Sequence, residues 1–356
     1  MRVFSQYFNG FEDVIMKKII TIVAAAALCL SCLVSCGGPK ALADYTLAET
    51  EQYVTLGNYA GVSVSQAEID STVQSQLDSV LSASATSEAK NGAAEDGDTV
   101  TYSCTGTVGG AAADALTMTD KTFTVGTDTT SIEALDAAFA GMSAGDTKEL
   151  SVTIPANYAG DETVDGKDAV LNLTVSGVTE TVIPETLTDD MVSTYTDGTY
   201  ATIAAYKEAL AKTVKENLAF SAALQTCTFK GYPADLAETY YNNSIASYTA
   251  AAQNYNVTLE VYASAMGVDI DTLTSYLAQQ AIAQAKQDIA LCAIALKEGL
   301  EPTDADVEKT ENEMMEMYGF TSKDELYAAI KKDLLKQSAK HQMVVEMIAD
   351  KAVVTD

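Results

Sequence analysis

Three cysteines near the start of the chain have a spacing that could support chemistry. Cys29, Cys32 and Cys36 fall within eight residues, in the stretch LCLSCLVSCGG. The spacing of Cys29 and Cys32 is that of a redox pair or of half a metal site. However, residues 19–34 are a continuous apolar run behind the basic start Met16-Lys17-Lys18, which is typical of a secretory signal segment. Because such a segment is cleaved away together with its cysteines, we expect no redox or metal site there.

The end of the apolar run resembles the lipobox of bacterial lipoproteins. It reads Leu33-Val34-Ser35-Cys36-Gly37. In that family the cysteine is acylated and becomes the first residue of the mature chain, so the resemblance assigns lipidation to Cys36. We therefore expect the mature protein on the outer face of the cytoplasmic membrane, anchored by its N-terminal lipid.

The first residues of the chain fit a signal peptide poorly. Glu12 and Asp13 interrupt the basic start that such a segment needs, and Met16 is therefore the expected true start. These patterns predict a signal peptide at residues 1–35 and a lipid-anchored tether at 36–50.

The composition excludes several classes of function. The formal net charge of −29 disfavours nucleic acid as a partner, since Lys and Arg supply that binding. His341 is the only histidine, so zinc hydrolysis or a Ser-His-Asp triad would depend on it alone. It falls on the apolar face of the last predicted helix, where a structural role is the simpler reading. We expect no cofactor and no metal.

Two kinds of secondary structure follow each other along the chain. The stretches 99–104, 121–126, 148–154 and 170–178 alternate apolar and polar residues, which predicts an antiparallel sheet with one buried face. Only 133–140 within this region has a helical pattern, so the region is an α+β domain. Residues 67–83 and most of the chain from 185 onward show helical spacing, and 84–97 has the composition of a linker.

Four stretches within residues 98–180 resemble the FK506-binding-protein (FKBP) type of prolyl isomerase. In the order and spacing of that family they are Asp98–Gly106, Phe123–Gly126, Phe139–Gly145 and Ile154–Tyr158. The resemblance implies an FKBP-like sheet with one short helix and peptidyl-prolyl cis-trans isomerase (rotamase) activity. That reaction requires no nucleophile or metal, because binding the twisted amide better than either planar form is sufficient.

The segments on both sides of this region resemble trigger factor. They are residues 57–77, 184–191 and 303–356. In that family the isomerase domain is inserted into an all-α chaperone body, which is built from the segments before and after it. The resemblance implies a first segment at 51–94 that packs with the body, an isomerase domain at 95–182 and a helical chaperone domain at 183–356. The family's ribosome-binding domain is not part of the resemblance, so we expect no ribosome partner.

The family's catalytic positions correspond to Asp114, Ile132 and Tyr158 in this sequence. In the family the tyrosine donates a hydrogen bond to the substrate carbonyl, the aspartate lies in the pocket, and the backbone N–H of the isoleucine meets the peptide. The resemblance implies the same roles here.

The pocket positions depart from the family pattern. They are Cys104, Phe123, Leu135 and Leu171, and the family's usual aromatic residue is absent at all of them except Phe123. Ala113 also stands where phenylalanine is usual. We expect weak peptide affinity, because an aromatic side chain would bury about 150–250 Å². A second interpretation stays open, in which these residues are ordinary core of the sheet and Phe123 faces that core.

Two functions are compatible with these observations. The first is an extracytoplasmic, lipid-anchored isomerase and holdase chaperone for unfolded or nascent secreted polypeptides. The alternative is a binding-only chaperone with a degenerate isomerase domain. A transporter's binding lipoprotein would need two α/β lobes, which the patterns do not show, and a parvulin-type foldase would need histidines within 98–180.

Overall fold

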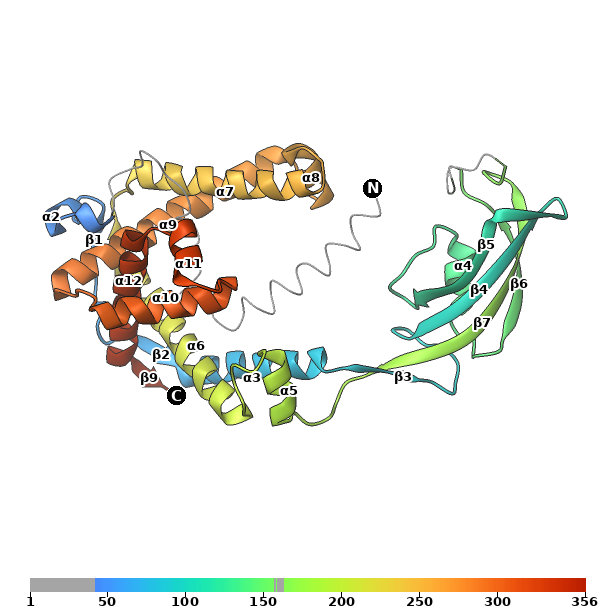
Figure 1. Cartoon of the computed structure of the whole chain (residues 1–356), viewed down its shortest axis with the longest axis horizontal. Helices are drawn as coiled ribbons and strands as arrows, with labels where there is room; N and C mark the ends of the chain where they lie inside the picture. Colours follow the sequence, from blue (N-terminus) through green and yellow to red (C-terminus); the bar gives the residue numbers. More distant parts are fainter. Residues whose placement is uncertain (1–41, 157, 159–162) are drawn as a thin grey trace. The chain divides into compact units, whose positions relative to one another are not determined.

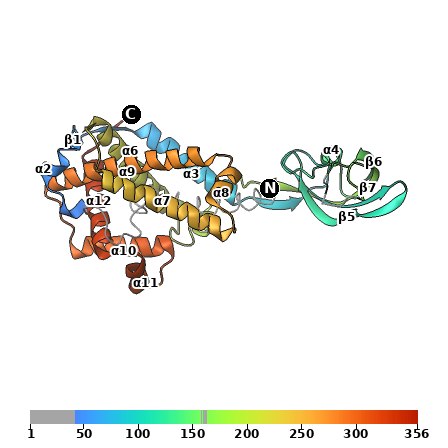
Figure 2. The same cartoon turned by 90° about the horizontal axis from the view of Figure 1, so that it is seen from above.

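The computed structural model describes residues 42–156, 158 and 163–356 (Figures 1 and 2). The predicted signal peptide and Cys36 lie outside this part of the chain. The chain divides into two compact units, Met1–Leu77 with Val192–Asp356 and Asp78–Met191. Within the described residues, no helix has both the length and the apolar character needed to cross a membrane.

The unit Asp78–Met191 is built on a five-stranded sheet and one short helix. The strands are β3 (Thr86–Ala89), β4 (Thr99–Val108), β5 (Ala111–Thr124), β6 (Thr147–Thr153) and β7 (Asp168–Val182), and the helix is α4 (Glu133–Phe139). The order is β3-β7-β4-β5, β6 also pairs with β7, and every pairing is antiparallel. The alternating burial along β7 confirms the predicted sheet with one buried face.

The structure differs from the prediction before and within this sheet. Residues 84–97 were expected to be a linker, but Thr86–Ala89 form β3 and pair with Thr179–Val182 of β7. All four residues of β3 are exposed, and an exposed edge strand carries no apolar alternation that the sequence could show. The compact unit that contains β3 begins at Asp78, within helix α3 (Gln66–Ala83). The Ala- and Thr-rich residues 111–120 also extend β5 beyond the predicted strand.

The other unit is mainly helical. Its helices, together with two that cross the division between the units (α3 and α5), are η2 (Leu42–Asp44), α2 (Leu47–Thr50), α3 (Gln66–Ala83), α5 (Asp189–Tyr195), α6 (Ile203–Thr226), α7 (Ala234–Asn254), α8 (Leu259–Ala265), α9 (Ile270–Glu298), α10 (Asp304–Tyr318), α11 (Lys323–Ala329) and α12 (Lys332–Lys351). Helices α10 and α11 begin after Thr303 and Ser322, whose hydroxyls accept from the N–H groups of Asp306 and Glu325. Gly319 ends α10 with φ 69°, a conformation that favours glycine.

Helix α9 forms the centre of the helical unit. It packs against α7, α8, α12 and the segments η2, α2 and β1. Its residues 288–295 are all buried, and several of them are alanines. Such small side chains let neighbouring helices approach closely, which explains how one helix can contact so many elements.

Two short strand pairs connect distant segments within the helical unit. Strand β1 (Val54–Thr55) pairs antiparallel with β8 (Thr228–Phe229), and β2 (Ser63–Ser65) pairs parallel with β9 (Val353–Thr355). The segment before the sheet-containing unit is thus joined to both the middle and the end of the chain.

Candidate functional site

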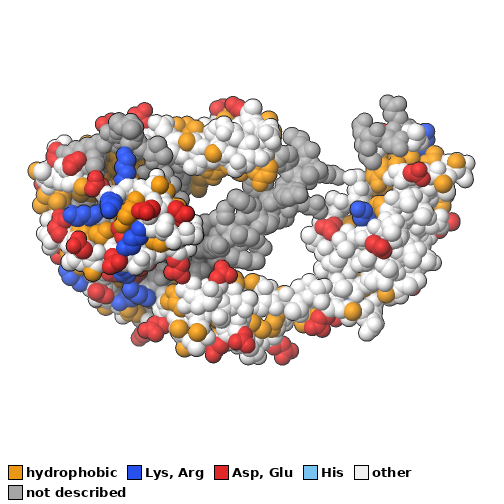
Figure 3. Space-filling view, in the orientation of Figure 1, with side chains coloured by type: hydrophobic (Ala, Val, Ile, Leu, Met, Phe, Trp, Pro, Cys, Tyr) orange, Lys and Arg blue, Asp and Glu red, His pale blue; other side chains and the backbone are white. Residues whose placement is uncertain are grey.

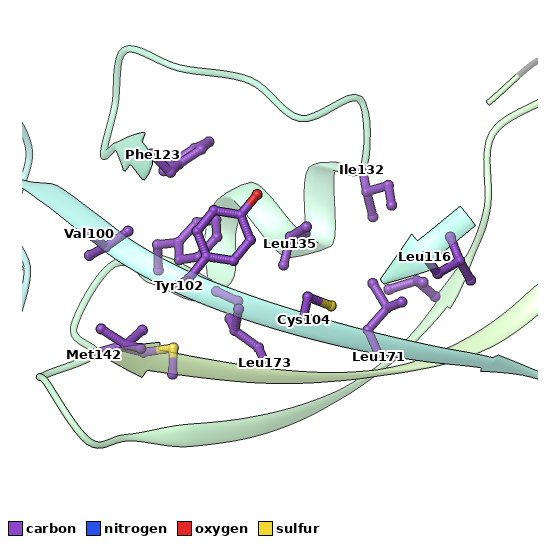
Figure 4. Close-up of a cluster of buried hydrophobic side chains, with 14 of the residues drawn as sticks. Val100, Tyr102, Cys104, Leu116, Phe123, Ile132, Leu135, Met142, Leu171 and Leu173 are labelled. Carbon is purple, nitrogen blue, oxygen red and sulfur yellow. The ribbon is translucent and has the colours of Figure 1, made fainter. Parts of the chain in front are cut away.

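The sheet and α4 of the second unit enclose a cluster of buried apolar side chains (Figure 4). Strand β4 contributes alternate residues, among them Tyr102 and Cys104, and β7 contributes Leu171 and Leu173. Gly106 permits this packing, because an added Cβ would lie only 2.4 Å from Cβ of Leu116. The predicted pocket positions are therefore assembled around one core.

The structure places the predicted pocket residues deep in this cluster. The side chains of Cys104, Leu135 and Leu171 are fully buried. Phe123 is also buried and stacks on Phe139, with 4.4 Å between the ring centroids. Phe123 therefore faces the core, as the second interpretation of the sequence anticipated.

Tyr158 occupies the border of the cluster. It is half-buried and packs against the apolar side chains. Burial, and to a lesser extent the neighbouring Cys104 thiol, raises the pKa of Tyr158 above 10.0. Its hydroxyl is therefore protonated at neutral pH and is able to donate a hydrogen bond to a carbonyl oxygen.

Asp114 is the exposed member of the predicted site residues that the structure describes. It is exposed on β5, whereas its neighbours Ala113 and Ala115 pack against the cluster. The pairing of β4 with β5 is irregular at this point, because Cys104 pairs with Met118 and Gly106 with Ala113, so simple strand alternation does not fix the face on which Asp114 lies. The role expected for Asp114 in the pocket stays a prediction.

Ile132 precedes the first turn of α4, and its backbone N–H is already engaged. It donates to Oγ1 of Thr130 across 3.3 Å. Oγ1 of Thr130 in turn donates to Oδ1 of Asp136, which also accepts from the backbone N–H of Thr130 at 2.8 Å. The predicted peptide donor is thus part of a local network that the sequence reasoning missed.

Tyr102 is a further residue of the site that the sequence did not single out. Its ring centroid lies 4.6 Å from that of Phe139, and its hydroxyl donates to Sδ of Met118 at 3.6 Å. Burial, followed by the nearby Cys104, raises the pKa of Tyr102 to about 12. The alternation along 99–104 was the available signal, since it places Tyr102 on the same face as Cys104. An aromatic ring therefore fills part of the space beside the cysteine.

The helical unit carries the second candidate surface. This unit is rich in tyrosine and methionine, and several of these residues, among them Tyr240, Tyr262 and Met314, are buried. The side chains of Tyr276 and Val261, however, are 54% and 50% exposed. They lie on α9 and α8, beside a small core that these helices share with α7, and apolar side chains appear at this surface in Figure 3.

The charges and donor groups offer no metal site in the described residues. No group of three His, Cys, Asp or Glu side chains there is arranged to hold a metal ion. His341 is buried in the helical unit, 3.9 Å from Asp288. This geometry fits the structural role expected for it.

An antiparallel sheet that encloses an apolar cluster with one short helix defines the class of this unit as FKBP-like. Comparison with protein families agrees, because residues 90–177 match the FKBP-type peptidyl-prolyl cis-trans isomerase family. Residues 201–354 match the family described as bacterial trigger factor protein C-terminus. The chain thus combines an FKBP-type isomerase domain with a trigger factor C-terminal domain.

Curated trigger factors match most of the chain. The trigger factor of Limosilactobacillus fermentum is 27% identical over 321 residues, covering 84% of this chain and 71% of that protein. The trigger factor of Staphylococcus epidermidis is 26% identical over 316 residues, covering 85% and 72%. A solved trigger factor chaperone, from a study of promiscuous substrate recognition in folding and assembly, matches with 17% identity and a TM-score of 0.31. That match covers 83% of this chain and 72% of the other. The chain is thus a trigger factor homologue over most of its length, and its FKBP-type domain supports peptidyl-prolyl cis-trans isomerase activity.

Proposed function

We propose that this chain is a lipid-anchored, extracytoplasmic folding factor that combines prolyl isomerase and holdase activity on secreted polypeptides. The observation that carries the proposal is the joining of three features in one sequence. A lipobox-like stretch at 33–37 precedes a trigger factor body with an FKBP-type domain between its parts. Its partners are unfolded or nascent secreted chains and, through the lipid, the membrane.

The isomerase half needs only an apolar surface and a few hydrogen bonds. Rotation about an Xaa–Pro bond faces a barrier of roughly 18–20 kcal/mol, because the amide has partial double-bond character. The twisted amide is less dipolar than the planar one, so an apolar surface favours it. Tyr158, at the border of the cluster, supplies the hydrogen-bond donor to the substrate carbonyl.

The holdase half uses the exposed apolar side chains of the helical unit. Tyr276 and Val261 present apolar surface beside the shared core of α7, α8 and α9. Tyrosine suits such a role, because its ring contacts apolar segments while its hydroxyl remains hydrated. Because both units belong to one chain, a client held by the helical unit is tethered to the isomerase domain, which raises the local concentration of its prolines.

A refolding experiment tests both activities together. A reduced, unfolded protein whose slow phase is limited by proline isomerisation is refolded with and without the full chain, purified in detergent. A faster slow phase and a higher yield support the proposal, whereas no change in either rejects it. Higher yield with an unchanged rate would favour the binding-only alternative. A specific observation supports that alternative, because the side chains of Cys104, Leu135 and Leu171 are completely buried.

The anchoring is tested separately in cells. Labelled fatty acid should be incorporated into the wild-type chain and not into Cys36→Ser, which should also leave the membrane fraction. Cys32→Ser is the matched control and should retain the label. Label that persists in Cys36→Ser would reject the proposed anchor.

A further inference from the structure

The backbone N–H of Ile132 is occupied by a side chain of the protein itself. Its acceptor is Oγ1 of Thr130, two residues earlier, at 3.3 Å. The same oxygen lies 3.4 Å from the carbonyl oxygen of Ile132. The hydroxyl of Thr130 therefore lies beside the edge of the peptide group that an incoming peptide would approach.

Several contacts hold Thr130 in this position. Asp136, on α4, accepts from both the backbone N–H and the hydroxyl of Thr130. Ser131 between the two residues has φ 75°, which turns the chain back so that Thr130 faces the amide of Ile132. Two hydrogen bonds thus run in series, from the Ile132 amide through the Thr130 hydroxyl to the Asp136 carboxylate, and a series of this kind polarises each member.

We propose that Thr130 is a positioning residue that sets the peptide affinity of the isomerase domain by competing with the substrate for the Ile132 amide. The inference rests on the proposed isomerase function and on the predicted role of Ile132. A substrate carbonyl must displace Oγ1 of Thr130 before it can accept from that amide. The competition acts on binding, so Thr130 raises KM and leaves kcat nearly unchanged.

Steady-state kinetics on a chromogenic Xaa-Pro tetrapeptide test this inference with the full chain. In Thr130→Ala the hydroxyl is lost, while the backbone N–H that contacts Asp136 remains. We expect KM to fall roughly 2- to 10-fold, the range of one net hydrogen bond, with kcat within about twofold of wild type. Thr130→Ser should restore the wild-type KM, and Thr129→Ala, at the exposed neighbouring threonine, should leave it unchanged.

Amide hydrogen exchange at Ile132 provides a readout that does not depend on turnover. Exchange in the free protein should be faster in Thr130→Ala than in wild type and Thr130→Ser. An unchanged or higher KM in Thr130→Ala would overturn the inference even though the isomerase function stood.

If no variant showed turnover, the isomerase half of the proposed function would fail instead. Titration of the same tetrapeptide, followed through the Ile132 amide signal, would then decide the inference. Tighter binding by Thr130→Ala would support competition at that amide, and equal or weaker binding would overturn it.

Discussion

Nδ1 of His341 lies 3.9 Å from Oδ1 of Asp288, and both side chains are buried between α12 and α9. The hydroxyl of Tyr240 and, at 3.0 Å, the amide of Gln284 donate to the carboxyl group of Asp288. Burial raises the pKa of Asp288 to about 7. Burial, together with nearby Lys340, lowers the pKa of His341 to about 4. In the unfolded chain the ordinary pKa values are 6.5 for histidine and 3.8 for aspartate, so the histidine holds the proton between these values. Folding reverses the order of the two pKa values, and between about pH 4 and 6.5 it therefore moves the proton from the histidine to the aspartate.

This transfer leads to a prediction about pH and stability. Between pH 4 and 6.5 the pair holds one proton in both the folded and the unfolded chain, so it adds no pH dependence. His341→Gln removes the site that binds this proton in the unfolded chain, whereas folded Asp288 still binds one below about pH 7. Relative to wild type, the free energy of unfolding should then rise by about 1.4 kcal/mol per pH unit as the pH falls from 7 toward 4.

Urea denaturation of wild type and His341→Gln at a series of pH values measures this difference. Asp288→Asn added to the His341→Gln chain removes both titrating groups and should abolish the slope. Parallel stability curves for wild type and His341→Gln would contradict the assigned proton.

Gly106 and Gly177 provide a matched pair for the close packing of the sheet. A Cβ at Gly106 would lie 2.4 Å from Cβ of Leu116 and 2.9 Å from Cδ2 of Leu171. At Gly177, on β7, the nearest atom would be Cβ of Thr101 at 3.9 Å, an ordinary contact. We expect Gly106→Ala to lower the free energy of unfolding by about 1–3 kcal/mol and Gly177→Ala to change it far less. Equal effects in thermal or urea unfolding would show that the cluster adapts to the added methyl group.

The variant Cys104→Tyr tests whether the apolar cluster is fully packed or has room for an aromatic side chain at position 104. The thiol is fully buried, and the rings of Tyr102 and Phe139 lie close together in the same cluster. A further ring, placed at position 104, should therefore overpack the cluster. We expect it to lower the free energy of unfolding by about 1–3 kcal/mol without raising kcat/KM. Cys104→Ala is the control for loss of the thiol alone. A stable Cys104→Tyr with a lower KM would instead show an open pocket that accepts the ring.

Tyr158→Phe tests the predicted hydrogen bond to the substrate. Loss of one such bond should lower kcat/KM on a prolyl peptide roughly 2- to 10-fold. Because the pKa of Tyr158 is raised above its ordinary 10.0, the wild-type enzyme should show no loss of activity from this group between neutral pH and that value. Tyr102→Phe, which removes a buried hydroxyl from Met118, should leave kcat/KM close to wild type. An equal effect in both variants would indicate a general packing defect.

Local patterns were sufficient to predict many of the elements. The alternation in 148–154 and 170–178 predicted β6 and part of β7, and the helical spacing in 67–83 predicted α3. These features depend on residues two to four apart, which the sequence displays directly. The resemblance to trigger factor and FKBP added the order of the domains.

Tertiary structure decided the features that depend on distant or exposed partners. Strand β3 has no apolar alternation of its own, and its place in the sheet follows from backbone pairing with β7. The same holds for β2 and β9, which lie at opposite ends of the described chain.

The candidate site divides in the same way. The sequence by itself determined which residue types meet there, including the non-aromatic ones at positions 104, 135 and 171. Only the tertiary structure decided that Phe123 faces the core and that Asp114 is exposed. It alone also decided that the Ile132 amide is bound by Thr130. The physical reason is that the face of a strand and the partner of an amide depend on register and turn geometry, which many side chains set together.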